Sequence, residues 1–203
     1  FIPAAERYGL IGVIDEWVIS RGLEIAAHRP ITVNVSASTI CADQQVDRIE
    51  QAILTSNITA GNVVFEITET AVCEDLDAAQ RFATRMRGLG CGIALDDFGV
   101  GHGSFTYLRH LPVDYLKIDN QFVRALSTNV EDQQIVTAIV SVAHQFGLHT
   151  IAEGVEGQGT LDELVRLGVD YAQGYFTGPP MPLLDRWKLI GTPPRGTAHV
   201  SSI

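Results

Sequence analysis

Short runs of apolar, mostly β-branched residues alternate along this chain with longer stretches in which apolar residues recur at helical spacing. The short runs predict six strands, at 31–35, 63–67, 93–95, 115–118, 149–152 and 171–172. The longer stretches predict helices over 46–54, 77–89, 131–146 and 160–167, and two consecutive helices within 4–28. Strands and helices in regular alternation predict a parallel sheet with right-handed connections.

Glycines and prolines mark where these elements should end. Breaks are expected within 4–28 at Gly9, Gly12 and Gly22, and left-handed helix ends at Gly88, Gly147 and Gly168. After the prolines at 179–182, a short helix is expected over 184–189, followed by a loose tail over 191–203.

Polar side chains accompany every predicted strand. A polar residue at one strand end is usually a helix cap or a turn former. Six such positions in succession are different, because carboxylates gathered at one place raise each other's pKa unless a cation lies among them. The pattern therefore predicts a metal site, and ligands spread over every strand favour a closed βα barrel over an open sheet with one switch point. The residues concerned are Asn34, Glu66, Glu69, Asp96, Asp97, Lys117, Glu153, Glu156 and Gln173.

Composition narrows the class of protein. With 203 residues, 46% of them hydrophobic, the chain is expected to form one soluble domain, and no apolar run is long enough to span a membrane. A net charge of −10 argues against binding a nucleic-acid polymer, whereas a small phosphate ester could bind through divalent cations. The acidic balance could equally serve solubility alone. The cysteines at 41, 73 and 91 are expected to be reduced, mostly buried thiols in a cytosolic setting.

Several motifs occur in an order that resembles one bacterial family, the EAL-domain cyclic di-GMP phosphodiesterases. They are Phe1-Ile2-Pro3, Val33-Asn34-Val35-Ser36-Ala37, Glu66-Ile67-Thr68-Glu69, Asp96 to Gly101, Lys117-Ile118-Asp119, Ala152-Glu153-Gly154-Val155-Glu156 and Gln173-Gly174-Tyr175. The resemblance implies a TIM-like (β/α)8 barrel with one strand reversed. It also implies a hydrolase that cuts cyclic di-GMP to linear pGpG in a reaction that requires Mg²⁺ or Mn²⁺.

The resemblance also implies a role for each polar residue. Two metal ions would be held by Asn34, Glu66, Asp96, Asp97 and Glu153. Lys117 would contact the attacking water or a phosphate oxygen, and Glu153 could accept a proton. Asp97, Lys117 and Glu153 are therefore the expected catalytic residues, and Lys117 and Gln173 the expected substrate contacts. Glu69 would anchor the loop after Asp97, and Glu156 would support the site.

The chain departs from the common family pattern in two places. In the loop over 97–105, Val100, Gly103 and Phe105 replace the more usual Thr, Ser and Leu, and loop function is expected to survive. The family's Glu-Ala-Leu segment lies upstream of the motif that begins at Phe1, and six strands fall short of eight. The chain is therefore expected to be an EAL domain over 1–190 without its first one or two βα elements. By itself it should turn over slowly or not at all, whereas the parent protein should be active.

Two other functions stay open at this point. Some members of this family bind cyclic di-GMP without cutting it, although such members typically lose several carboxylates or the lysine, and all of these are kept here. An unrelated metal-dependent barrel lyase would share the fold but leave the motif spacing unexplained. A cytoplasmic location is expected, with a membrane anchor elsewhere in the parent left open. A homodimer is also left open, and flanking sensor or cyclase domains are expected in the parent protein.

Overall fold

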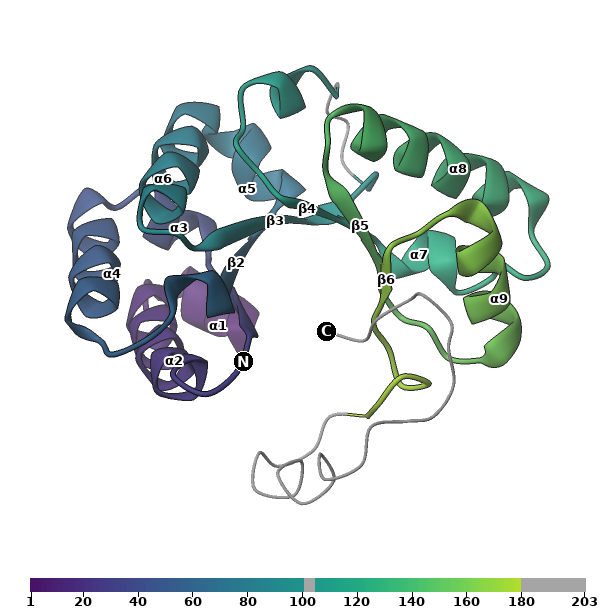
Figure 1. Cartoon of the computed structure of the whole chain (residues 1–203). Coiled ribbons are helices and arrows are strands. Elements are labelled where there is room, and N and C mark those ends of the chain that lie inside the picture. The colour runs from purple at the N-terminus through teal and green to yellow at the C-terminus, as the bar shows by residue number, and fades with distance from the viewer. Residues whose placement is uncertain (101–104, 180–203) are drawn as a thin grey trace. The chain divides into compact units, whose positions relative to one another are not determined.

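A computed structural model describes residues 1–100 and 105–179, and these fall into two compact units. The first unit contains Phe1–Lys117 with Phe146–Leu148, and the second contains Ile118–Gln145 and the residues from His149 onward. The division falls within one strand, β4 (Tyr115–Ile118). Each unit is built from strands that alternate with helices, as predicted (Figure 1).

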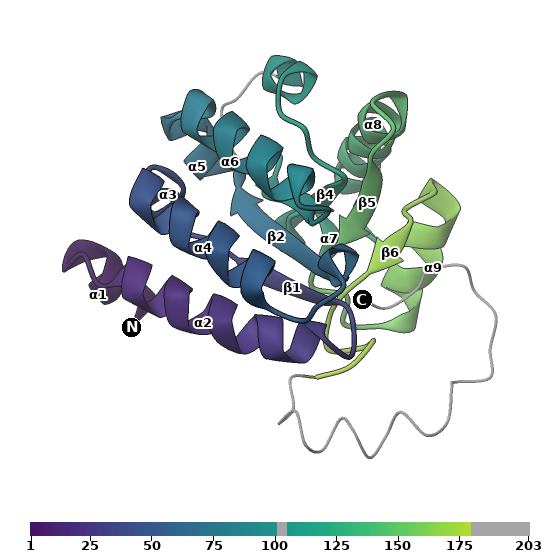
Figure 2. The same ribbon diagram turned by 60° about the vertical axis from the view of Figure 1, so that its left-hand side comes forward.

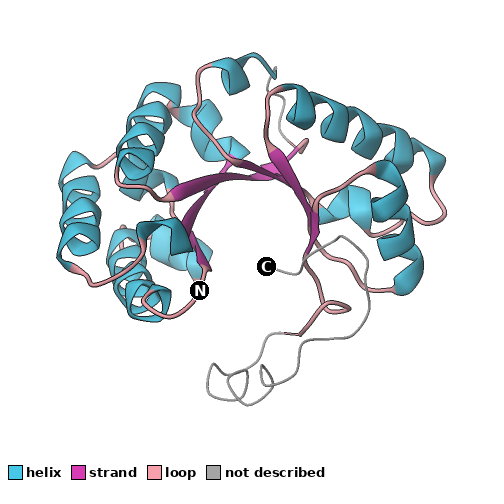
Figure 3. Ribbon diagram, viewed as in Figure 1, coloured by secondary structure: helices cyan, strands magenta, loops and turns pink. Residues whose placement is uncertain are grey.

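The first unit contains a parallel sheet with helices packed along it. Its other strands are β1 (Ile31–Asn34), β2 (Val63–Thr68) and β3 (Gly92–Phe98). In the parallel pairing, Asn34 lies opposite Glu66, and Thr68 lies opposite Asp96. Helices cover one face of these strands (Figure 3). The helices of this unit are α1 (Ile2–Arg7), α2 (Ile11–Ala26), α3 (Ala37–Ile40), α4 (Asp43–Thr55), α5 (Glu69–Glu74) and α6 (Leu76–Gly88).

Burial of apolar side chains fixes the sheet against these helices, of which α2, α4 and α6 run side by side (Figure 2). Phe65 of β2 is fully buried, and its ring meets Phe82 of α6 edge to face at 5.7 Å. Burial of one such side chain contributes about 2 kcal/mol. Successive residues of a strand point to opposite faces, so Glu66 points to the face opposite Phe65.

The second unit continues the alternation with α7 (Asn120–Val123), α8 (Val130–Gln145), β5 (His149–Ala152), α9 (Gln158–Leu167) and β6 (Tyr171–Ala172). Strands β5 and β6 are parallel, with Ile151 opposite Tyr171. The last residue of β4 belongs to this unit, and its carbonyl accepts a hydrogen bond from the Glu153 N–H at 3.1 Å. The order of the strands thus follows the chain from β1 to β6.

The six predicted strands and the predicted longer helices are confirmed, with ends shifted by up to three residues. The short helices α3, α5 and α7 and the 3-10 turns at Ala60–Asn62 and Phe105–Arg109 were not predicted. Among the described residues, no helix is long and apolar enough to cross a membrane. The expected helix at 184–189, the tail at 191–203 and the loop positions Gly101 and Gly103 lie outside the described residues.

Some glycine predictions were wrong for a packing reason. Gly9, with φ of 67°, does separate α1 from α2, but Gly12 and Gly22 lie inside α2. At Gly22 a Cβ would meet Val33 at 3.1 Å, so this glycine allows the helix to approach β1 rather than ending the helix. Gly147 and Gly168 are left-handed as predicted, whereas after α6 the left-handed residue is Gly90 and not Gly88.

The cysteine prediction was also partly wrong. All three thiols are free, but Cys41 and Cys73 are exposed and only Cys91 is buried. Burial raises the pKa of Cys91 to about 11. Cys41 and Cys73 lie in or beside the short helices α3 and α5, which the apolar pattern did not predict.

Candidate active site

One face of the first unit's sheet gathers the polar residues that the sequence placed at strand ends. Asn34 and Glu66 lie side by side on β1 and β2, and Asp96 lies on β3 opposite Thr68, two residues beyond Glu66. Because side chains alternate between faces along a strand, residues two apart share a face. Asn34, Glu66 and Asp96 therefore lie on the same face of the sheet.

Lys117 of β4 lies between two of these carboxylates. Its Nζ is 2.9 Å from Glu66 Oε2 and 3.0 Å from Asp96 Oδ1. All three side chains are buried, with exposures of 2% for the lysine, 4% for the glutamate and 8% for the aspartate. A charged group that is removed from water needs a close partner of opposite charge to offset its loss of hydration. Here both carboxylates contact the same ammonium group.

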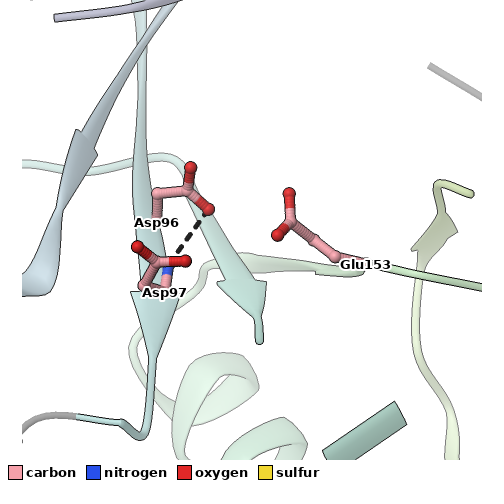
Figure 4. Close-up of side chains that lie close together, drawn as sticks. All are labelled: Asp96, Asp97 and Glu153. Carbon is pink, nitrogen blue, oxygen red and sulfur yellow. Dashed lines mark hydrogen bonds between the residues drawn. The ribbon is translucent and has the colours of Figure 1, made fainter. Parts of the chain in front are cut away.

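Asp97 has an unusual backbone conformation. Its φ of 56° makes it the one non-glycine residue with positive φ among the described parts of the chain. Its N–H donates to Asp96 Oδ1 at 3.0 Å, the hydrogen bond drawn in Figure 4. A residue held in this region costs on the order of 1 kcal/mol, and such strain often occurs at functional sites. The strand thus turns at the two adjacent aspartates.

Glu69, at the start of α5, contacts the loop that follows Asp97. The N–H of Gly99 donates to Glu69 Oε2 at 3.0 Å, and Glu69 is only 3% exposed. Gly99 has φ of 98°, as the expected turn requires. Burial, and secondly the Glu69 charge, raise the pKa of Tyr107, which lies beyond the loop. This arrangement supports the predicted role of Glu69 as a loop anchor, which stays a prediction.

The second unit presents the three remaining predicted residues after β5 and β6. Glu153 is half-buried and follows β5 directly, whereas Glu156 and Gln173 are exposed. The Gln173 N–H donates to the Ala152 carbonyl at 2.8 Å, and the Gln173 carbonyl accepts from the Val155 N–H at 3.1 Å. These hydrogen bonds fix the backbone at the ends of β5 and β6.

One buried carboxylate was missed. Asp15 of α2 is 7% exposed and accepts two hydrogen bonds from Ser36, two residues after Asn34. A signal was present, because Ile11, Asp15 and Ile19 are four residues apart and so share one face of the helix. A charged residue between two buried isoleucines indicates a buried polar contact, but its partner could not be identified from the spacing.

Parallel strands joined by helices, with carboxylates, an amide and a lysine near the strand ends, are typical of one class of protein, the βα-barrel enzymes. Comparison with known families then identifies the group. The chain belongs to the EAL domain family, whose sequence model matches residues 1–180.

Individual relatives agree with this assignment. The chain is 40% identical over 190 residues to the cyclic di-GMP phosphodiesterase PdeB of Shewanella oneidensis, covering 90% of this chain and 22% of PdeB. It is 35% identical over 193 residues to the cyclic di-GMP phosphodiesterase PdeF of Escherichia coli K12, covering 91% of this chain and 26% of PdeF. The chain thus spans about a quarter of the length of these curated relatives.

Solved structures show the same fold. The PaMucR phosphodiesterase in complex with c-di-GMP superposes with a TM-score of 0.85 at 35% identity, over 92% of this chain and 78% of that one. The FimX EAL domain from Pseudomonas aeruginosa bound to c-di-GMP gives 0.84 at 28% identity, over 89% and 75%. The fold is therefore that of the EAL (β/α) barrel, of which the described residues contain six strands.

Proposed function

We propose that the protein hydrolyses cyclic di-GMP to linear pGpG in a reaction that requires divalent metal ions. The observation that carries this proposal is the buried group of Glu66, Asp96 and Lys117 on the sheet of an EAL-family chain. Relatives named cyclic di-GMP phosphodiesterases support the substrate. The receptor alternative is less well supported, because the chain keeps these charged residues.

The available ligand atoms fit Mg²⁺ or Mn²⁺. Asp96 and Asp97 of the first unit and Glu153 of the second would each offer a carboxylate oxygen to an ion, and Figure 4 draws these three side chains. The side chains of Asn34 and Glu66 supply further oxygens, which these hard cations prefer. Within the first unit, the negative charges of Glu66, Asp96 and Asp97 outnumber the single positive charge of Lys117 by two, which one divalent cation would balance.

Bound divalent ions would polarise the phosphodiester and lower the pKa of the attacking water. The chain's own residues would orient the reactants. Lys117 fixes the Glu66 and Asp96 carboxylates through its ion pairs and would donate a hydrogen bond to a phosphate oxygen or to the water. Glu153 would accept a proton from the water. Gln173 would contact the dinucleotide, Glu156 would support the site, and Glu69 would hold the loop through Gly99.

Measuring pGpG release from cyclic di-GMP by the parent protein tests the proposal. Activity in Mn²⁺ should be lost in EDTA, and Asp96→Asn should lower kcat on the order of 100-fold or more. Asp77→Asn, an exposed change in α6, is the matched control and should retain wild-type activity. If the wild-type parent protein binds cyclic di-GMP but releases no pGpG in Mg²⁺ or in Mn²⁺, the receptor function would be favoured instead.

A further inference from the structure

Asp15 forms a buried hydrogen-bond network at the end of β1. A single oxygen, Oδ2, accepts from the Ser36 N–H at 3.0 Å, the Ser36 hydroxyl at 2.6 Å and the Thr39 hydroxyl at 2.7 Å. Among the described residues, no cation lies within ion-pair distance of Asp15. The carboxylate is thus stabilised by three donors from one short segment, and hydrogen bonds to an ionised acceptor are the strong ones.

This segment begins two residues after Asn34, a proposed metal ligand. The Val35 N–H donates to the Glu66 carbonyl at 2.9 Å and continues the pairing of β1 with β2. One residue later, the chain leaves the strand at Ser36, which is the N-cap of α3 and is bonded to Asp15. The backbone around Asn34 is therefore fixed by the sheet before it and by α2, through Asp15, after it.

The position of Asn34 needs such support more than the positions of Glu66 and Asp96. Glu66 and Asp96 are buried and share contacts with Lys117, whereas Asn34 is exposed. An exposed amide that has to meet a metal ion depends on its backbone for orientation. Groups that orient metal ligands typically change metal affinity 10- to 100-fold when they are replaced.

We infer that Asp15 is a positioning residue for metal binding, acting through the Ser36 turn on Asn34. The inference rests on the proposed function, in which Asn34 is a metal ligand. It extends the set of functional residues to a helix on which no metal ligand is proposed. Removing the charge of Asp15 should therefore weaken metal binding even though Asp15 does not contact the ion.

The test is a double-mutant cycle with Asp15→Asn and Asn34→Ala, read as the Mn²⁺ concentration at half saturation. Saturation can be followed in the whole protein by the loss of the free Mn²⁺ signal in electron paramagnetic resonance, without substrate. Asp15→Asn and Asn34→Ala should each raise the midpoint about 10-fold. The double variant should match Asn34→Ala alone, because residues that act through one contact are not additive.

A second carboxylate in the same unit provides the control. Asp114 Oδ2 accepts the N–H of Ile93 at 2.9 Å, which fixes the opposite end of a strand, β3. Asp114→Asn should lower the unfolding temperature and leave the Mn²⁺ midpoint unchanged. If Asp15→Asn does not fold, Ser36→Ala removes one hydroxyl donor and should raise the midpoint by a smaller factor.

The outcomes separate the two proposals. If Asn34→Ala raises the midpoint but Asp15→Asn and Ser36→Ala leave it at the wild-type value, the positioning role is wrong and the metal site stands. Full additivity in the double variant would also overturn the positioning role. If Asn34→Ala itself has no effect, the ligand role of Asn34 fails, and the inference about Asp15 fails with it.

Discussion

Replacing Lys117 by methionine should destabilise the protein strongly. Lys117 is 2% exposed and contacts two buried carboxylates, so Lys117→Met removes the only ammonium group that the structure places between Glu66 and Asp96 in the described chain. Removing one partner of a buried ion pair costs about 3–5 kcal/mol, because the remaining charge stays buried without a partner. For a domain of this size, that corresponds to a fall in unfolding temperature of roughly 6 to 20 °C.

Thermal unfolding followed by circular dichroism in EDTA measures this loss. Mn²⁺ should restore part of it, because an ion at about 100 times its dissociation constant stabilises the folded state by about 2.7 kcal/mol. The double variant Lys117→Met with Glu66→Gln should be more stable than Lys117→Met alone, since one buried charge is removed. Both effects follow from uncompensated charge rather than from lost packing.

An exposed ion pair gives the matched control. Arg21 and Glu24 are 2.7 Å apart with side chains that are 61% and 62% exposed, so Arg21→Met should cost less than about 1 kcal/mol. The reasoning is refuted if Lys117→Met is as stable as Arg21→Met in EDTA. It is equally refuted if Lys117→Met is more stable than the wild-type protein in EDTA.

Three further predictions follow from the second unit and the cysteines. Gly174→Ala should lower stability by about 1–3 kcal/mol in a thermal melt, because the new Cβ would lie 2.3 Å from the Val155 backbone. Gly178→Ala is the control and should leave the melting temperature unchanged, because its Cβ would meet nothing within 4 Å. Burial raises the pKa of Asp170, but hydrogen bonds from the Thr150 backbone, His144 and the Thr150 hydroxyl outweigh it and lower the pKa below the ordinary value. The contribution of Asp170 is therefore complete above about pH 4 and lost as the pH falls through the folded-state pKa. Asp170→Asn should cost about 1–2 kcal/mol at pH 7 and less at pH 3 in denaturant titrations, and a gap independent of pH would contradict this. Ellman's reagent should label two thiols in the folded protein and the third, Cys91, only on unfolding, so three rapidly reacting thiols would count against the burial of Cys91.

The strands and long helices could be predicted because each has to bury a regular apolar face. The run at 63–67 alternates between the helix-covered face, with Phe65, and the polar face, with Glu66, and the structure pairs it as expected. The short helix α3 has only four residues and is held by the Ser36 cap and Asp15. It is too short to show the helical spacing of apolar residues from which a helix is predicted. Local capping and long-range hydrogen bonds leave little trace in a hydrophobic pattern.

The candidate site could be predicted by residue type but not by contact. Carboxylates after successive strands indicated metal binding, and the motif spacing indicated the family. The contacts of Lys117 with Glu66 and Asp96 depend on the register between strands that are far apart in the sequence. The spacing of motifs along the chain does not determine this register. The network around Asp15 was missed for the same reason, since its partners lie 21 and 24 residues away.

The proposed function requires that the acidic and amide side chains of the candidate site bind the ions on which hydrolysis depends. Anomalous X-ray diffraction from crystals soaked in Mn²⁺ tests it most directly. We expect manganese peaks next to oxygens of Asn34, Glu66, Asp96, Asp97 and Glu153. Manganese bound elsewhere, or no bound manganese in crystals of a protein that still releases pGpG, would contradict it.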